Sequence, residues 1–172
     1  MNVLPVAVAL IALERLIELF HAARNTRALK RRGAVEAGAA HYPLFVLLHA
    51  SWLGALLVFV PWDTPPNWFW LGLMIALLAL RLWVIVSLGP YWTTRIVTLP
   101  GAPLVQRGPY RFLNHPNYAV VTAEIAALPL AFGAYAIAIT FSLANLALLA
   151  WRVRIEDRAL AARRGIAAPP VG

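Results

Sequence analysis

The sequence predicts an all-α integral membrane protein with about five transmembrane helices in one domain. Hydrophobic residues make up 62% of the 172 residues and charged residues only 13%, a balance far from that of soluble domains. The apolar residues are gathered into long stretches that approach roughly 20 residues, the length that a bilayer-spanning helix needs. No polar linker divides the chain, so we expect a single domain over residues 1–172.

The apolar stretches set the expected elements in order. They predict helices at about 3–20, 42–60, 67–88, 118–132 and 134–151. The last two divide one apolar run at Gly133 and are short for a span, so we expect this pair to cross tilted or to enter the bilayer only partly. Between the third and fourth helices lies a polar cytosolic loop at 89–117, and a cytosolic tail follows at 152–172.

The basic residues predict the orientation. All but Arg15 and Arg81 of the 15 Lys and Arg residues lie in three groups, which follow the first helix, occupy the 89–117 loop and close the chain, whereas the turns at 61–66 and 133–134 have none. By the positive-inside rule the N-terminus is extracytoplasmic and the C-terminus cytosolic, as in a multi-pass protein of the cell membrane. Orientation and anionic lipid head groups account for the net charge of +8, so we expect no nucleic-acid partner.

Charged residues also occur inside the apolar stretches. Such groups cost free energy in a bilayer unless they are paired or line a polar cavity. Both roles are open, and the sequence does not assign the partners. The residues concerned are Glu14, Arg15, Glu18, Arg81 and Glu124. Helical spacing places Glu14, Glu18, His21 and Asn25 on one face, which we expect to point into the bundle.

The 89–117 loop is long, proline-rich and aromatic, which favours a functional segment over a simple connection. Residues 95–99 and 104–107 flank a Pro-Gly-Ala-Pro turn and predict a small hairpin. Pro116 suits the first turn of the next helix, with Asn114 or His115 near its cap. That helix start, with Arg107 and Arg111, is able to hold an anion. The alternative is that both arginines only obey the positive-inside rule and His115 only caps the helix.

The segment 107–118, RGPYRFLNHPNY, is followed by RIEDRAL at 154–160. Together they resemble the isoprenylcysteine carboxyl methyltransferase family, whose members are small membrane enzymes. The matching positions are Arg107, Pro109, Tyr110, His115, Pro116, Tyr118 and Glu156. Asn114, Val120 and Asp157 depart from the family pattern, which often has Arg, Gly and a second Glu there. ERLIELFHAARN and HYPLFVLLHASW are similar to a bacterial branch associated with lipid-tailed polyketide synthesis.

The resemblance implies an S-adenosylmethionine-dependent O-methyltransferase, similar to protein-S-isoprenylcysteine carboxyl O-methyltransferase, with a lipid-tailed or prenylated acceptor in the membrane. Methyl transfer from a sulfonium needs alignment and exclusion of water, and no metal. The implied cofactor-binding residues are Arg107, Tyr110, Arg111, His115, Pro116, Tyr118 and Glu156. The implied catalytic residues are His115 and Glu156. His115 is the candidate base for a phenol or enol acceptor, whereas a carboxylate acceptor needs only positioning.

Two other functions compete with this interpretation. Membrane sterol reductases, which use a nicotinamide cofactor, are similar over the HPNY segment at 115–118, although they are generally much larger. A non-enzymatic membrane subunit, such as a transporter component, also fits charged residues within the bilayer. In that case Glu156 would form only a surface salt bridge.

Overall fold

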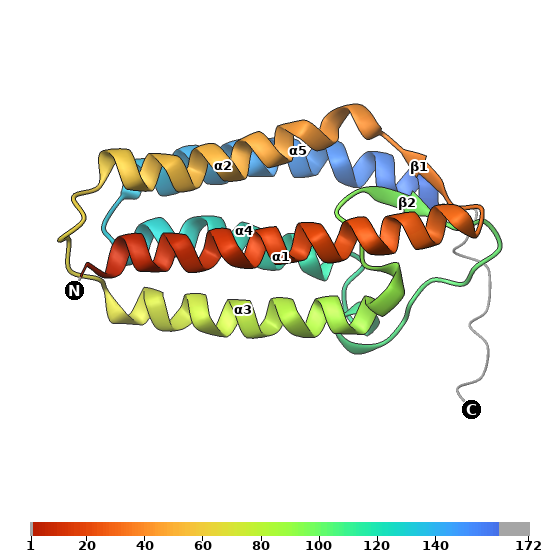
Figure 1. The fold of residues 1–172 in the computed structure, drawn as a ribbon, viewed down its shortest axis with the longest axis horizontal. Helices are drawn as coiled ribbons and strands as arrows, with labels where there is room; N and C mark the ends of the chain where they lie inside the picture. The colour runs from red at the N-terminus through yellow and green to blue at the C-terminus, as the bar shows by residue number, and fades with distance from the viewer. Residues whose placement is uncertain (1, 162–172) are drawn as a thin grey trace.

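The computed structural model describes residues 2–161, and within them five α-helices run side by side along one axis (Figure 1). They are α1 (Val3–Arg31), α2 (Tyr42–Phe59), α3 (Trp68–Leu88), α4 (Pro116–Ala131) and α5 (Tyr135–Leu160). The N-terminus and the α2–α3 and α4–α5 turns lie at one end of the bundle, and the strands and the long loop lie at the other. The predicted all-α class is confirmed.

Three helical segments of the described chain are long and apolar enough to cross a membrane. They are Ala39–Phe59, Trp68–Tyr91 and Tyr135–Leu160. Two of the five expected spans do not join this group, since α1 carries charged residues along its length and α4 has only 16 residues. The five crossings and the extracytoplasmic N-terminus stay predictions of the charge pattern.

Two helices extend further than hydropathy predicts. The helix expected at 3–20 continues to Arg31, and the helix expected at 134–151 continues to Leu160. The added residues are mostly Ala, Leu, Arg, Lys and Glu, which favour helix without being apolar. Hydropathy therefore marks where the apolar part ends and not where the helix ends. The first part of the predicted 152–172 tail is helical, and its part beyond residue 161 lies outside the described residues.

The short elements sit together at the loop end of the bundle. They are β1 (Val35–Ala37), η1 (Ala39–His41), η2 (Gly89–Tyr91), β2 (Ile96–Thr98) and η3 (Gly108–Arg111). The predicted hairpin between 95–99 and 104–107 is wrong, because β2 pairs instead with β1, antiparallel, with Glu36 opposite Val97. A strand edge bonds to whichever edge tertiary packing brings beside it, and here this is the α1–α2 connection.

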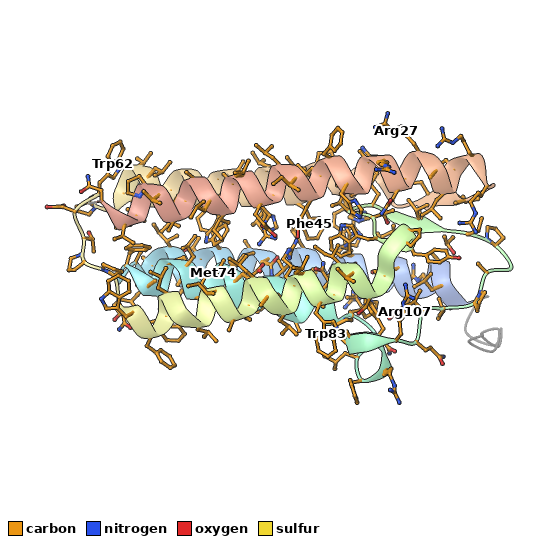
Figure 2. The ribbon with its side chains drawn as sticks, turned by 60° about the horizontal axis from the view of Figure 1, so that its bottom comes forward. Arg27, Phe45, Trp62, Met74, Trp83 and Arg107 are labelled. Carbon is orange, nitrogen blue, oxygen red and sulfur yellow. The ribbon has the colours of Figure 1, made fainter. Side chains whose placement is uncertain are left out.

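The core is built around α4, the shortest helix. It packs against both α3 and α5, and its buried side chains include Val120, Ile125 and Leu128. Met74 of α3 points in among the helices, whereas Trp62 and Arg27 lie at opposite ends of the molecule (Figure 2). The outer surfaces of the helices are rich in exposed Leu, Val, Phe and Trp, as expected of helices that face lipid.

A buried network of ion pairs joins α1 to α3 and α4. Arg81 of α3 donates from Nε and Nη2 to the Glu18 carboxylate of α1, over 2.5 and 2.6 Å. Arg15 donates from Nη2 to Glu124 Oε2 over 2.5 Å, and Arg81 Nη1 lies 3.3 Å from the same oxygen. Glu14 adds contacts of 3.3 Å to Arg15 and 3.4 Å to Arg81. The five charged residues within the apolar stretches therefore form one network.

The polar face predicted for α1 is only partly buried. Glu18 and Asn25 are buried, and Asn25 donates to the Gly89 and Trp92 backbone carbonyls over 3.2 and 2.9 Å. His21 is exposed and not turned into the bundle, although its Nε2 lies 3.3 Å from Asn25 Nδ2. Asn25 thereby attaches α1 to the start of the functional loop.

The close approach of η3 to α3 depends on glycine at position 108. Gly108 has φ of +57°, and a Cβ there would overlap with Ser87 Oγ. Gly101 has φ of +75°, but a Cβ there would meet open space. We expect Gly101→Ala to lower the free energy of unfolding by about 1–2 kcal/mol, the cost of a left-handed residue. Gly108→Ala should lower it further, because α3 and η3 must also separate.

Thermal unfolding of the two variants in detergent measures this difference. Both substitutions place an alanine at a left-handed backbone position. Gly101→Ala is therefore the matched control, and the further loss of stability in Gly108→Ala measures the overlap with Ser87. Equal midpoints for the two variants would show that the contact between η3 and α3 is loose.

Candidate functional site

The turn into α4 places His115 and Tyr118 against each other. Pro116 begins the helix, where its missing N–H would in any case have no partner within the helix. The imidazole of His115 stacks on the Tyr118 ring, with centroids 5.2 Å apart and ring planes 9° from parallel. His115 occupies the N-cap position, but its side chain makes no capping hydrogen bond. Capping is therefore not what its imidazole does.

The last turns of α5 bring Arg152 and Glu156 to the same tyrosine. Residues four apart share one helix face, and both side chains reach the Tyr118 hydroxyl. This hydroxyl donates to Glu156 Oε2 and accepts a hydrogen bond from Arg152 Nε over 2.7 Å. Arg152 Nη2 also donates to the Thr94 backbone carbonyl over 2.9 Å. The contact links α5, α4 and the loop.

His115 lies between two carboxylates of α5. Its Nε2 is 3.3 Å from Asp157 Oδ1, and its Nδ1 is 3.6 Å from Glu156 Oε2. The side chains of His115 and Glu156 are only 20% and 24% exposed, which favours well-defined positions. Both nitrogens of the ring thus face groups that accept protons, an arrangement suited to orienting or exchanging a proton.

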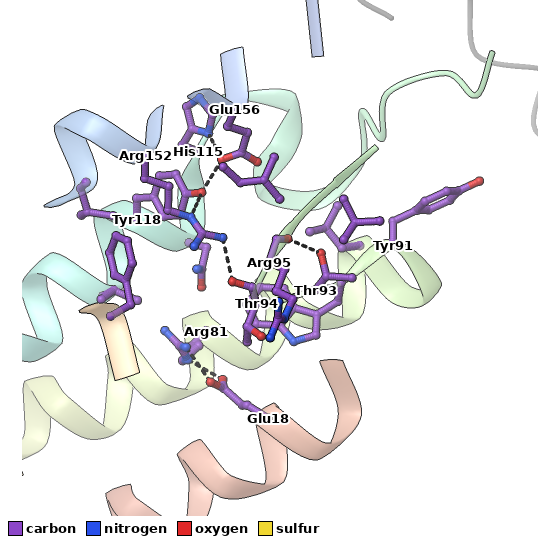
Figure 3. A pocket seen from close by; sticks show the side chains of 18 of the residues that line it. Glu18, Arg81, Tyr91, Thr93, Thr94, Arg95, His115, Tyr118, Arg152 and Glu156 are labelled. Atoms are coloured by element: carbon purple, nitrogen blue, oxygen red, sulfur yellow. Dashed lines mark hydrogen bonds and ion pairs between the residues drawn. The ribbon is translucent and has the colours of Figure 1, made fainter. Parts of the chain in front are cut away.

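These side chains close one end of a cavity of about 860 Å³, within the range of roughly 300–1,000 Å³ that holds small ligands. Figure 3 shows Arg152, Tyr118, His115 and Glu156 at one side of it, with Arg81 and Glu18 at the other. The apolar part of the wall includes Leu16 and Leu19 of α1 and Val46 and Leu53 of α2. The cavity therefore runs from the polar loop into the space between the helices.

Most of the predicted site residues line this cavity. Those that do are Tyr110, Arg111, His115, Tyr118 and Glu156. Arg107 lies elsewhere: its side chain is exposed and its Nε donates to the Ser87 backbone carbonyl over 2.7 Å, so it attaches η3 to the end of α3. Pro116 is buried in the first turn of α4 and is not part of the lining. Their predicted roles in cofactor binding stay predictions.

Several polar residues of the lining were not predicted from the sequence. They are Arg95, Gln106, Asn114, Asn117, Arg152 and Asp157. Arg152 could have been found from its spacing of four residues before Glu156, had the helix been extended beyond residue 151. Asn117 is a further candidate because its Oδ1 is buried without a hydrogen-bond partner in the structure, and such an atom is expected to bond to a ligand or water.

Burial raises the pKa of the Tyr110 hydroxyl well above its ordinary value, and the negative charge of Glu156 raises it further. Tyr110 is therefore neutral at physiological pH and offers the cavity an aromatic face and a hydroxyl donor. It does not offer a base. In the described part of the chain, no three His, Asp or Glu side chains are placed to hold a metal ion.

Ion pairs of Glu36 on β1 hold Arg95, which lines the cavity. Its carboxylate contacts Lys30 Nζ at 2.6 Å and Arg95 Nη1 at 2.7 Å, and the Arg95 guanidinium lies over the Tyr42 ring at 4.4 Å. The hydrogen bond from Lys30, with the further one from Arg95, holds the pKa of Glu36 below its usual range. Glu36 thus connects α1, β1 and the cavity-lining loop.

Comparison with known proteins identifies the family of the chain. The model of the isoprenylcysteine carboxyl methyltransferase (ICMT) family matches residues 70–162. The protein belongs to the ICMT family. It is 39% identical over 158 residues to the uncharacterized protein YpbQ of Bacillus subtilis, covering 89% of this chain and 94% of the relative. It is 25% identical over 142 residues to an uncharacterized protein of Haemophilus influenzae, covering 80% and 83%. No solved structure matches the chain.

The ICMT match confirms the resemblance of the 107–118 segment. It extends from α3 to the end of α5 and so includes His115, Tyr118, Arg152 and Glu156. ICMT membership implies methyltransferase activity, and the three long apolar helices agree with a membrane protein.

The ion pairs of Glu36 predict a pH dependence of stability. Because its folded-state pKa lies below the ordinary value of 4.5, the ionised carboxylate contributes full stability above that value. The contribution declines as the pH falls and is lost once the pH has passed the folded pKa. We expect Glu36→Gln to lower the midpoint of thermal unfolding at pH 7, and its difference from wild type to disappear in acid.

Asp63→Asn is the matched control, since Asp63 is an exposed carboxylate in the α2–α3 turn. It should leave the midpoint unchanged at both pH values. A difference between wild type and Glu36→Gln that persisted in strong acid would contradict the role given to the ionised carboxylate.

Proposed function

We propose that the protein is an S-adenosylmethionine-dependent O-methyltransferase that acts on a lipid-tailed acceptor from within the cell membrane. One observation carries the proposal beyond the family assignment. A single cavity is polar at the loop end, where a soluble cofactor arrives, and is bounded by apolar side chains of α1 and α2 along the bundle. Such a cavity suits two ligands of different polarity that must meet.

The residues of the loop end fit S-adenosylmethionine chemically. Its carboxylate needs cationic partners, which Arg95 and Arg111 offer. Its amino and hydroxyl groups need acceptors, which Glu156 and Asp157 offer. The unpartnered buried Asn117 Oδ1 marks a place where a ligand donor is needed.

The bound cofactor would supply an electrophilic methyl group on a cationic sulfonium, and the chain's residues position and shield it. Aromatic faces attract cations, and Tyr110 and Tyr118 both line the cavity. Tyr118 is held by Arg152 and Glu156, so its ring has one orientation. Alignment of the acceptor oxygen with the methyl carbon then provides most of the rate enhancement, because it replaces an encounter in solution.

The acceptor oxygen determines what His115 does. A carboxylate is already ionised at neutral pH, and His115 then only helps to position it. A phenol or enol gives up its proton, and His115, beside two carboxylates, is placed to receive it. The lipid tail would lie along Leu16, Leu19 and Val46, where apolar burial favours it by about 0.8 kcal/mol per CH₂.

Cofactor binding tests the proposal directly. Calorimetric titration of the purified protein should show binding of S-adenosylhomocysteine and none of NADPH, and membranes incubated with methyl-labelled S-adenosylmethionine should transfer label to a lipid-soluble product. Alkali-labile label would indicate a carboxyl ester and alkali-stable label an ether. Binding of NADPH alone would favour a reductase, and binding of neither would favour a non-enzymatic subunit.

Arg152 provides a second test. Replacing it with Gln removes the support of Tyr118 and Glu156, so we expect kcat/KM to fall on the order of 100-fold, as for a misaligned site. Arg154→Gln is the matched control, because Arg154 is exposed on the same helix and lies outside the lining; its kcat/KM should stay within about twofold of wild type. Similar losses in both variants would show only a general effect of basic charge on α5.

A further inference from the structure

The end of the cavity remote from the cofactor residues is polar, although it lies halfway along the helices. Arg15 and Glu18 of α1 and Arg81 of α3 line it, and His49 of α2 lines the same cavity; Glu18 and Arg81 are seen in Figure 3. A simple hydrocarbon chain would offer no hydrogen-bond partner to the second ring nitrogen of His49 and would place apolar surface against the charged groups, which is costly. The polar end therefore favours an occupant with a polar group of its own.

The charges of this end favour a neutral group over an anion. Arg15 and Arg81 are already bonded to Glu18 and Glu124, at 2.5–3.3 Å. Glu14 is a third carboxyl group in the same network, so carboxyl groups outnumber guanidinium groups. An added anion would meet guanidinium groups that are already paired with carboxylates, and those carboxylates would repel it.

His49 defines the kind of neutral group. Its Nδ1 lies 2.8 Å from the Phe45 backbone carbonyl, which can only accept a hydrogen bond. In a neutral imidazole Nδ1 therefore carries the proton, and Nε2 is left as an acceptor. Trp52 meets the ring edge-on, with centroids 6.3 Å apart, and so helps to fix its orientation. A partner for Nε2 must be a donor, such as a hydroxyl group.

We propose that His49 Nε2 accepts a hydrogen bond from a hydroxyl group of the methyl acceptor that is distinct from the oxygen receiving the methyl group. The acceptor is then a hydroxylated lipid that is bound at both polar ends of the cavity, by the residues around Tyr118 at one end and by His49 at the other. This inference rests on the proposed methyltransferase function and adds the chemical class of its acceptor. His49 acts in recognition and takes no part in the transfer of the methyl group.

The first experiment identifies the product. Wild-type protein in nanodiscs is incubated with methyl-labelled S-adenosylmethionine and a total lipid extract of the native membrane, and the labelled lipid is purified and treated with acetic anhydride. The proposal expects the labelled lipid to gain an acetyl group, because a hydroxyl group survives methylation. A labelled lipid with no group that can be acetylated would overturn it.

The second experiment uses this purified acceptor with variants of α2. We expect His49→Leu to raise KM roughly 10- to 100-fold, the effect of leaving a buried hydroxyl without its partner, with kcat and the affinity for S-adenosylhomocysteine unchanged. His49→Gln should recover part of the loss, because its amide oxygen accepts the same hydrogen bond. Ser51→Ala is the control: Ser51 is exposed on α2 and likewise bonds to the carbonyl four residues earlier.

The outcomes separate this inference from the proposed function. An unchanged KM in His49→Leu, or an equal rise in Ser51→Ala, would overturn the role of His49 while leaving the methyltransferase intact. A loss of S-adenosylhomocysteine affinity in His49→Leu would show a structural role instead. Wild-type protein that neither binds S-adenosylhomocysteine nor transfers label would overturn both proposals together.

Discussion

The arrangement of the bundle depends on the buried ion pairs between Arg81, Glu18, Arg15 and Glu124. They join α1, α3 and α4 to one another through four charge contacts of 2.5–3.3 Å. Charges buried in an apolar environment are tolerated only when each has a close partner, so this network permits essentially one position of α1 along its neighbours. That position leaves the cavity between α1, α2 and the loop, and Arg15, Glu18 and Arg81 form its far wall.

A second constraint comes from the length of α5. Because the helix continues as far as Leu160, Arg152 and Glu156 extend past its apolar part and meet Tyr118 at the start of α4. The loop is joined to them by its Thr94 carbonyl. The polar end of the cavity is thus assembled from helices that are rigid and from a loop that is bonded to them, which favours precise placement of two ligands.

These two polar groups of side chains face each other across one cavity. The proposed acceptor therefore has polar groups at two separate positions. In the proposed reaction the tail lies along aliphatic side chains of α1 and α2, the Tyr118 end holds the reacting oxygen, and His49 accepts a hydrogen bond from a further hydroxyl group. A membrane enzyme with only an apolar tunnel would select for tail length. Polar groups in mid-bundle add selection by hydrogen bonding, which discriminates more strongly because an unpaired buried group is costly.

The sequence by itself determined the helical class, the positions of the apolar segments, the family, and five of the cavity-lining residues: Tyr110, Arg111, His115, Tyr118 and Glu156. These follow from local composition and from a motif whose members lie close in the chain. Only the tertiary structure decided the partners of Arg15 and Arg81, the pairing of β2 with β1, the contact of Arg107 with α3, and the place of His49 in the cavity lining. Each of these depends on which helix faces which, and helix packing is set by contacts between residues far apart in the sequence, for which hydropathy and spacing carry no signal.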